Sequence, residues 1–217
     1  MTIHWSLFVP GVLLLLFPAD RLLSARVELR SFDCLQGLGN SPRYRPWWWV
    51  PALWLDPLRG FLGTLLLRHA MEMTSVTWTL TPKLAYALAV GIVALGVLCQ
   101  TFTRRGDKGV LLAPIGFVGG VVAALMPWSV ALLGLITAGL GLFAFRQFHV
   151  FFLFGLAAVA VLGFVLGAGE MWIGPAVGAF ALPIVAGLVT SSTLELPTRD
   201  GSGAPLPATP LPTTPQS

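Results

Sequence analysis

Four uncharged stretches constrain this chain most strongly. They cover residues 84–103, 109–145, 147–169 and 171–194 and contain 20, 37, 23 and 24 residues. The chain of 217 residues is 56% hydrophobic and 10% charged, whereas soluble domains have roughly 25% charged residues. About 20 apolar residues suffice for a helix that crosses the hydrocarbon core of a bilayer. The pattern excludes a soluble globular enzyme, a disordered chain and a nucleic-acid-binding domain. It predicts an all-α, polytopic transmembrane helical bundle of about seven spans.

The longest uncharged stretch must contain a turn. A helix over its 37 residues would be about 55 Å long, nearly twice the roughly 30 Å of the hydrocarbon core. Proline breaks helices and tryptophan favours the membrane interface, so the turn is predicted at Met126-Pro127-Trp128. Five closely connected antiparallel spans are therefore expected within residues 84–190, with approximate bounds 84–103, 109–126, 128–145, 149–168 and 171–190.

Two further spans are marginal. Residues 4–19 are apolar but short for a span. In residues 46–67 the large apolar side chains contribute about −4 to −5 kcal/mol toward insertion, and Asp56 and Arg59 each oppose it by about 2.5 to 3.5 kcal/mol. The sum is close to zero, so this segment inserts only if the two charges pair or face protein. If it is re-entrant instead, the chain has five or six spans.

The segments outside the spans divide the chain into regions. Residues 20–36 place several apolar side chains near one helical face, which predicts an amphipathic helix, either in the lipid headgroup region or as a solvated loop helix. The tail from Ser191 onward is rich in Pro, Thr and Ser and is predicted to be extended and disordered. The predicted regions are an N-terminal membrane-associated part (1–83), a five-helix bundle (84–190) and a cytoplasmic tail (191–217).

The basic residues predict an orientation. With seven spans, ten Lys and Arg residues fall on one side of the membrane and two on the other. Basic residues concentrate in cytoplasmic loops, so a multi-pass protein of the plasma (inner) membrane is expected, with its C-terminus cytoplasmic and its N-terminus external. This bias also accounts for the net charge of +4, and no nucleic-acid partner is expected. The expected partners are the lipid bilayer and other membrane proteins or a second copy of the chain.

Three ionisable residues are candidates for a transport site. Asp56 and Arg59 are spaced i,i+3, which puts them on one helical face where they can pair. Ionisable groups within a membrane are functional hypotheses by default, although a neutralised structural pair is the alternative. Glu170 stands between two apolar stretches. It is either a carboxylate in a transport path or a water-exposed loop residue.

Evidence for catalysis is weaker. His69 and Glu72 are spaced i,i+3 at the predicted outer interface, and they are the candidate residues for an interfacial enzyme. Metal ligation and acid–base chemistry need several convergent groups. The sequence has no HExxH motif and no nucleophile elbow, and Cys34 and Cys99 fit no CxxC pattern. We therefore expect no cofactor, no metal site and no catalytic residue.

Small residues recur at four-residue spacing along the predicted spans. Such faces let helix backbones approach closely within a membrane. They predict a tightly packed bundle, through contacts within the chain or with a second copy. The candidate helix-packing residues are Gly116, Gly120, Gly163, Gly167, Gly174 and Gly178.

Three functions remain open at this stage. The first is a non-enzymatic accessory or packing component of a membrane assembly, which the packing faces favour. The second is a small-solute or ion transporter that uses Asp56 and Arg59, with Glu170 as a further candidate. The third is an interfacial membrane enzyme that acts on a lipid-linked substrate. A polar cavity that reaches Asp56 would favour the second.

Overall fold

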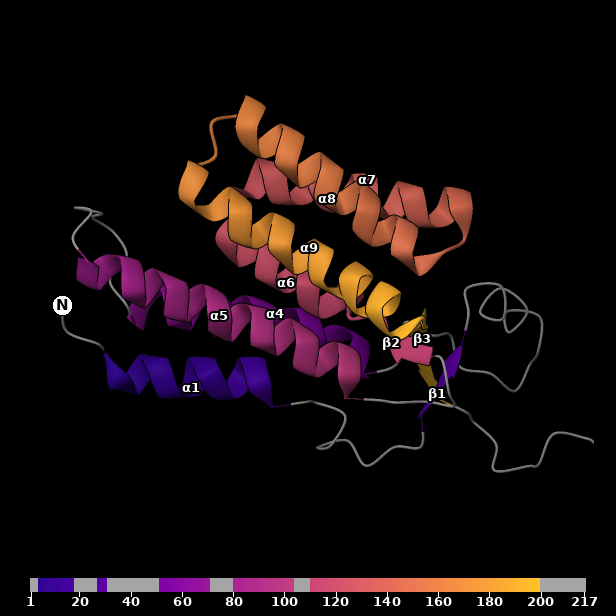
Figure 1. Ribbon diagram of the computed structural model, residues 1–217, viewed down its shortest axis with the longest axis horizontal. Coiled ribbons are helices and arrows are strands. Elements are labelled where there is room, and N and C mark those ends of the chain that lie inside the picture. Colours follow the sequence, from indigo (N-terminus) through magenta and orange to yellow (C-terminus); the bar gives the residue numbers. More distant parts are fainter. Residues whose placement is uncertain (1–3, 18–26, 31–50, 71–79, 104–109, 200–217) are drawn as a thin grey trace, which may run out of the picture.

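The computed structural model describes residues 4–17, 27–30, 51–70, 80–103 and 110–199. Within these ranges the chain forms seven helices and three strands (Figure 1). The helices are α1 (Trp5–Leu16), α4 (Pro51–Ala70), α5 (Leu80–Phe102), α6 (Ile115–Leu125), α7 (Trp128–Phe145), α8 (Phe148–Val165) and α9 (Glu170–Thr190). The strands are β1 (Val27–Arg30), β2 (Val110–Leu112) and β3 (Thr193–Arg199).

The helices run up and down along a common direction, and the strands gather at one end of the bundle (Figure 1). We call this the sheet end, and the other the distal end. Helix α4 packs against α1 and α6, α5 packs against α9 and α1, and α7 and α8 form a hairpin whose second helix packs on α9. The backbone N–H of His4 donates to the carbonyl of Ala70 (3.0 Å), so α1 begins beside the C-terminal end of α4. Both of these helix ends therefore lie at the distal end.

The predicted helical architecture is confirmed, and four helices are long and apolar enough to cross a membrane. These segments are Leu84–Phe102, Trp128–Phe145, Phe148–Val165 and Met171–Thr190. The predicted turn is also confirmed, because α6 ends at Leu125 and α7 begins at Trp128. The two marginal segments contain helices as well. The 20-residue helix α4 continues through Pro57, and the apolar helix α1 has 12 residues.

The predicted span over residues 109–126 is wrong in extent. Its first part is strand β2, and helix α6 has only 11 residues, about 16 Å against a hydrocarbon core of roughly 30 Å. Most of α6 is buried, including Phe117 and Val121. The apolar character of this stretch therefore reflects burial inside the bundle, and a fully buried helix is apolar all round, just as a membrane span is.

Glycines set the distance between α4 and α6. A Cβ atom at Gly120 would lie 2.0 Å from the carbonyl oxygen of Pro57, and one at Gly60 would lie 2.3 Å from that of Phe117. Both obstacles are backbone atoms, so no side-chain rotation could relieve the clash. The two helices pack backbone to backbone because both positions lack a side chain.

A three-stranded sheet in the order β1-β3-β2 corrects two predictions. Residues Val27–Arg30, within the predicted amphipathic helix 20–36, form a strand antiparallel to β3. Residues Thr193–Arg199, within the tail predicted to be disordered, form β3, which also pairs in parallel with β2. Both segments alternate apolar and polar residues, as in Val27-Glu28-Leu29-Arg30, and this period of two is the strand signal. Residues 18–26, 31–50 and 200–217 lie outside the described residues.

Candidate functional site

Asp56 and Arg59 form an ion pair inside the bundle. Nη1 of Arg59 donates to Oδ1 of Asp56 at 2.9 Å, and Nη2 donates to the carbonyl oxygen of Leu14 in α1 at 3.1 Å. The guanidinium also lies 6.0 Å from the centre of the Phe117 ring in α6. Arg59 is only 8% exposed. The predicted i,i+3 contact is therefore present, and it ties α4 to both neighbouring helices.

This arrangement suits a structural role. The Asp56 carboxylate offsets the guanidinium charge. The Leu14 carbonyl accepts a hydrogen bond from the guanidinium, and the Phe117 ring lies within cation–π distance of it. Neither the cavity at the C-terminal end of α4 nor the cavity between α5 and α9 is lined by Asp56 or Arg59. The geometry matches the alternative of a neutralised pair, and transport through these two residues stays a prediction.

The structure does not bring Glu170 to this pair. Glu170 is the first residue of α9, and this first turn of α9 lies beside the C-terminal end of α4, where Trp172 stacks on Arg68. Asp56 precedes Arg68 by 12 residues in the same helix, about 18 Å along its axis. The three transport candidates therefore belong to two separate places.

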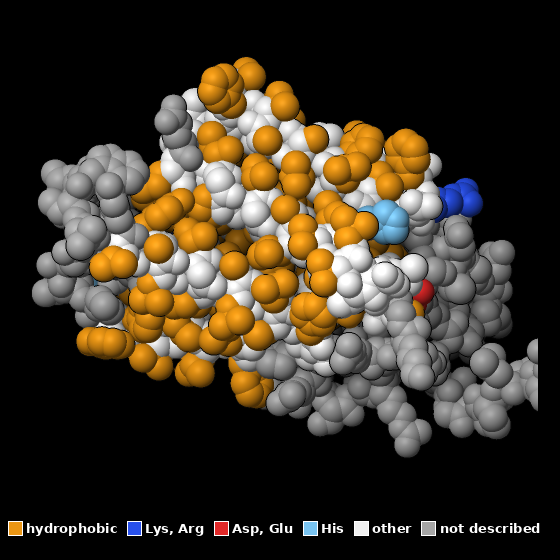
Figure 2. All heavy atoms as spheres, in the orientation of Figure 1, with side chains coloured by type: hydrophobic (Ala, Val, Ile, Leu, Met, Phe, Trp, Pro, Cys, Tyr) orange, Lys and Arg blue, Asp and Glu red, His pale blue; other side chains and the backbone are white. Residues whose placement is uncertain are grey.

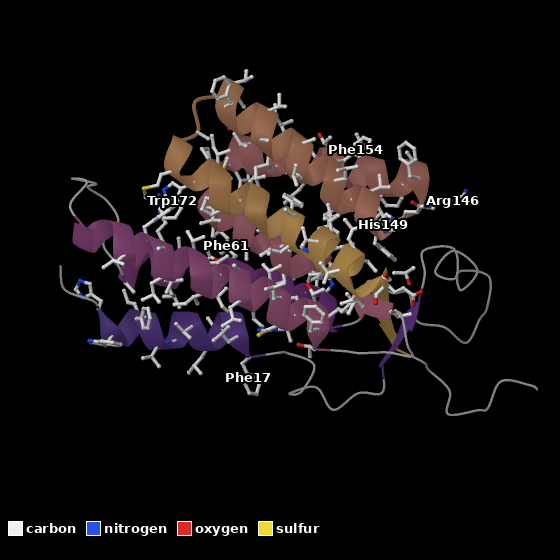
Figure 3. The ribbon with its side chains drawn as sticks, in the orientation of Figure 1. Phe17, Phe61, Arg146, His149, Phe154 and Trp172 are labelled. Atoms are coloured by element: carbon white, nitrogen blue, oxygen red, sulfur yellow. The ribbon has the colours of Figure 1, made fainter. Side chains whose placement is uncertain are left out.

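The histidines are also separated. His69 is exposed in the last turn of α4, and Glu72 lies outside the described residues. His149 is exposed at the start of α8, near Arg146 and toward the sheet end (Figure 3). Within the described ranges, no group of three or more His, Cys, Asp or Glu residues could hold a metal ion.

The candidate packing glycines have different surroundings. Gly120 lies at the contact between α4 and α6, and Gly116, four residues earlier in α6, is half-buried. A Cβ atom at Gly163 would meet side-chain atoms of Met126 and Ile173 at 3.0 to 3.3 Å. Gly167 has a φ of +65° in the turn after α8, a conformation that glycine adopts without strain. Gly174 and Gly178 face open space, with nothing within 4 Å of an added Cβ atom.

A cluster that the sequence did not single out lies at the distal end. Nη1 of Arg68 donates to the carbonyl oxygen of Ala124 at 3.3 Å, and the guanidinium lies 5.1 Å from the centre of the Trp172 ring. The Tyr86 ring packs edge-on against Trp172 at 5.8 Å, and its hydroxyl donates to the Met171 carbonyl at 2.5 Å. We call Arg68, Tyr86 and Trp172 the distal cluster. Figure 3 shows Trp172 at the end of the bundle opposite Arg146.

Two cavities adjoin the distal cluster. A small hollow of about 10 Å³ is lined by Thr64, Arg68 and Trp172 together with apolar side chains of α4, α5, α6 and α9. A groove of about 410 Å³ runs between α5 and α9, from Tyr86 past Gly174 and Gly178 to Val185. We call it the α5–α9 groove. Both cavities are almost entirely apolar, and they share Val90, Val93 and Pro175 in their walls.

Part of the distal cluster could have been inferred from the sequence. Arg68 and Trp172 both fall at the predicted outer interface, and Thr64 and Arg68 are spaced i,i+4 on one helical face. Their convergence with Tyr86 depends on the packing of α4 and α5 against α9, which no local pattern specifies. Comparisons with protein families, with curated proteins and with solved structures found no match to this chain, so its function must be argued from these residues.

Proposed function

We propose that this chain is a multi-pass integral membrane protein that serves as a non-enzymatic accessory component of a membrane assembly. The observation that carries the membrane location is the apolar outer surface of the helices. Large hydrophobic side chains remain exposed along α7, α8 and α9, among them Leu140, Phe164 and Val189. Hydrophobic side chains cover the helices on the face shown in Figure 2. Such a surface suits lipid, since soluble monomers rarely expose large contiguous apolar patches.

The distribution of charge supports an orientation in which the sheet end is cytoplasmic. On the face shown in Figure 2, the coloured charged side chains lie toward the sheet end. The sequence segments that adjoin helix ends there carry most of the Lys and Arg residues. This agrees with the basic bias of cytoplasmic loops. In the proposed arrangement the sheet end is available to cytoplasmic partners.

The accessory role is supported by how the bundle uses its charges. Asp56 and Arg59 form contacts that join α1, α4 and α6. An ion pair of this kind, with both side chains mostly buried, fixes the positions of the helices relative to one another. This role does not require a solute to reach the two charges. This favours an accessory role over ion transport through these two residues.

Two measurements test the proposal. Membranes that contain the tagged chain are washed with alkaline carbonate, and the chain should stay in the pellet and be released only by detergent. Release by carbonate alone would contradict integral insertion.

For the accessory role, membranes solubilised in a mild detergent are separated by native electrophoresis. The chain should migrate with a complex larger than its own detergent-bound monomer, and cross-linking with mass spectrometry should identify the neighbouring subunits. Migration as a monomer in every mild detergent, without cross-linked neighbours, would reject the accessory role and leave the membrane location intact.

A further inference from the structure

The distal cluster joins a cation to aromatic side chains at the ends of three helices. Arg68 lies in the last turn of α4, Tyr86 in the first part of α5 and Trp172 in the first turn of α9. Tryptophan and tyrosine are enriched where a bilayer meets water, and arginine binds phosphate through a planar set of donors. The bond to Ala124 uses one donor of Arg68, and the side chain is exposed. This is the chemistry that retains an anionic headgroup at an interface.

Thr64 gives an independent indication that a ligand binds here. Its side chain is 2% exposed, and among the described residues its hydroxyl has no hydrogen-bond partner. Thr64 belongs to the wall of the small hollow, together with Arg68 and Trp172. An unpaired buried hydroxyl is unfavourable because it has lost its hydrogen bonds to water, and the hollow is just large enough for one water molecule. Thr64 lies one helical turn deeper in the bundle than Arg68. A phosphate bound to Arg68 could therefore accept a hydrogen bond from the Thr64 hydroxyl, either directly or through that water molecule.

The α5–α9 groove supplies an apolar site next to these polar groups. Its volume of about 410 Å³ falls in the range of ligand sites, roughly 300–1,000 Å³. Gly174 and Gly178 leave the α9 side of the groove open. Because the groove shares Val90, Val93 and Pro175 with the small hollow, it continues from the distal cluster toward the middle of the bundle. α5 and α9 both contain candidate membrane spans, so the groove is placed where lipid chains can enter it.

We propose that this site binds one anionic phospholipid, with its phosphate on Arg68 and one acyl chain in the α5–α9 groove. A partner helix would fill an apolar groove without needing a cation and an unpaired hydroxyl at one end. A phospholipid presents an anion directly beside apolar chains, which matches the charge and the order of the two parts. The proposal depends on the membrane location proposed above, which the carbonate wash tests separately.

The binding experiment uses the full-length chain purified in detergent. Phosphatidylglycerol and phosphatidylcholine with identical acyl chains are added, and bound lipid is measured by native mass spectrometry. Phosphatidylglycerol should be retained preferentially. Arg68→Gln should reduce this preference about tenfold, as expected for loss of a charge-assisted hydrogen bond, and Arg68→Lys should retain part of it. Arg146→Gln, at an exposed arginine near the sheet end, is the matched control and should bind as the parent does.

Three further measurements distinguish a phospholipid site from a site for a free anion and from a threonine with a purely structural role. Gly178→Leu should weaken binding of long-chain phosphatidylglycerol and spare a short-chain analogue, because Leu would enter the groove. Thr64→Val should weaken lipid binding while leaving the lipid-free protein equally or more stable, a combination that a purely structural threonine would not produce. Inorganic phosphate should not displace the lipid.

Four results would overturn the proposal. They are an unchanged lipid preference in folded Arg68→Gln, an equal loss in Arg146→Gln, displacement of the lipid by phosphate alone, and unaltered binding in Gly178→Leu. Each variant is checked for native helix content and a single size-exclusion peak. If the protein resists the carbonate wash but shows no lipid preference, only the lipid site is rejected.

Discussion

Arg59 is the residue through which three helices are joined. Its guanidinium contacts the Asp56 carboxylate, the Leu14 carbonyl and the face of Phe117. The sequence predicted the pair from its i,i+3 spacing, because that relation is internal to one helix. The contacts to α1 and α6 could not be predicted, since they depend on which helices become neighbours. The same holds for the distal cluster, whose residues come from three helices.

Substitution of one member of this pair should destabilise the bundle. Arg59→Leu removes the guanidinium from the part-buried Asp56 carboxylate and breaks the bond to the Leu14 carbonyl, and loss of hydrogen bonds to a charged group costs about 1 to 3 kcal/mol. Thermal unfolding in detergent, followed by tryptophan fluorescence, measures the effect. The double variant Asp56→Leu/Arg59→Leu removes both charges and should recover much of the lost stability. If the double variant is as unstable as Arg59→Leu, the loss of stability does not come from breaking the Asp56–Arg59 ion pair.

Glycine substitutions should have opposite effects at two positions. Gly120→Ala places a Cβ atom 2.0 Å from the Pro57 carbonyl oxygen, so α4 and α6 must separate, at a cost of about 1 to 3 kcal/mol. Gly139→Ala in α7 adds a Cβ atom in open space and should stabilise the helix by up to about 1 kcal/mol. Thermal unfolding of the two variants in the same detergent provides the comparison. Equal effects would mean that the α4–α6 contact tolerates a wider spacing.

At the scale of elements, charge-free runs predicted the long helices well and the sheet not at all. The bounds 128–145 of α7 were predicted because a proline-containing turn precedes it and Arg146 follows it. The strands are different, since β3 pairs with β1 and β2, which are far from it in sequence. Their alternating patterns are only a few residues long, so each segment by itself is compatible with a loop or a helix.

We expect the stability of the sheet to depend on pH through Glu195. Glu195 lies opposite Leu112 in the pairing of β3 with β2. Burial raises the pKa of its carboxyl above the ordinary value of 4.5. The folded state therefore binds this proton more tightly than the unfolded state does. Stability is lost as pH rises from about 4.5 through the folded-state pKa. Glu195→Gln should match the parent near pH 4 and exceed it in thermal stability near pH 8. Glu195→Asp keeps a carboxyl and should keep the decline, and an unchanged decline in Glu195→Gln would exclude Glu195 as its source.

At the scale of the whole molecule, the sheet end and the distal end have different chemistry. Arg146, with the three strands, lies at the sheet end, whereas Arg68, Tyr86 and Trp172 gather at the distal end (Figures 1 and 3). The up-and-down order of the helices produces this polarity, because alternate connections return to the same end. The sequence predicted which side of the membrane each connection lies on by counting the helices between charged segments, and the orientation itself stays a prediction.

The two ends should therefore be accessible from opposite sides of the membrane. In a background where Cys34 and Cys99 are replaced by serine, His69→Cys marks the distal end and Arg146→Cys marks the sheet end, both at exposed positions. A membrane-impermeant maleimide added to intact cells should label His69→Cys and should label Arg146→Cys only after permeabilisation, because the basic end is retained in the cytoplasm. Reversed labelling would invert the proposed orientation. Labelling of both from the same side would mean that α5, α6 and α7, the helices between the two positions, do not carry the chain across the bilayer an odd number of times. The spanning role of the short helix α6 would then have to be reassigned.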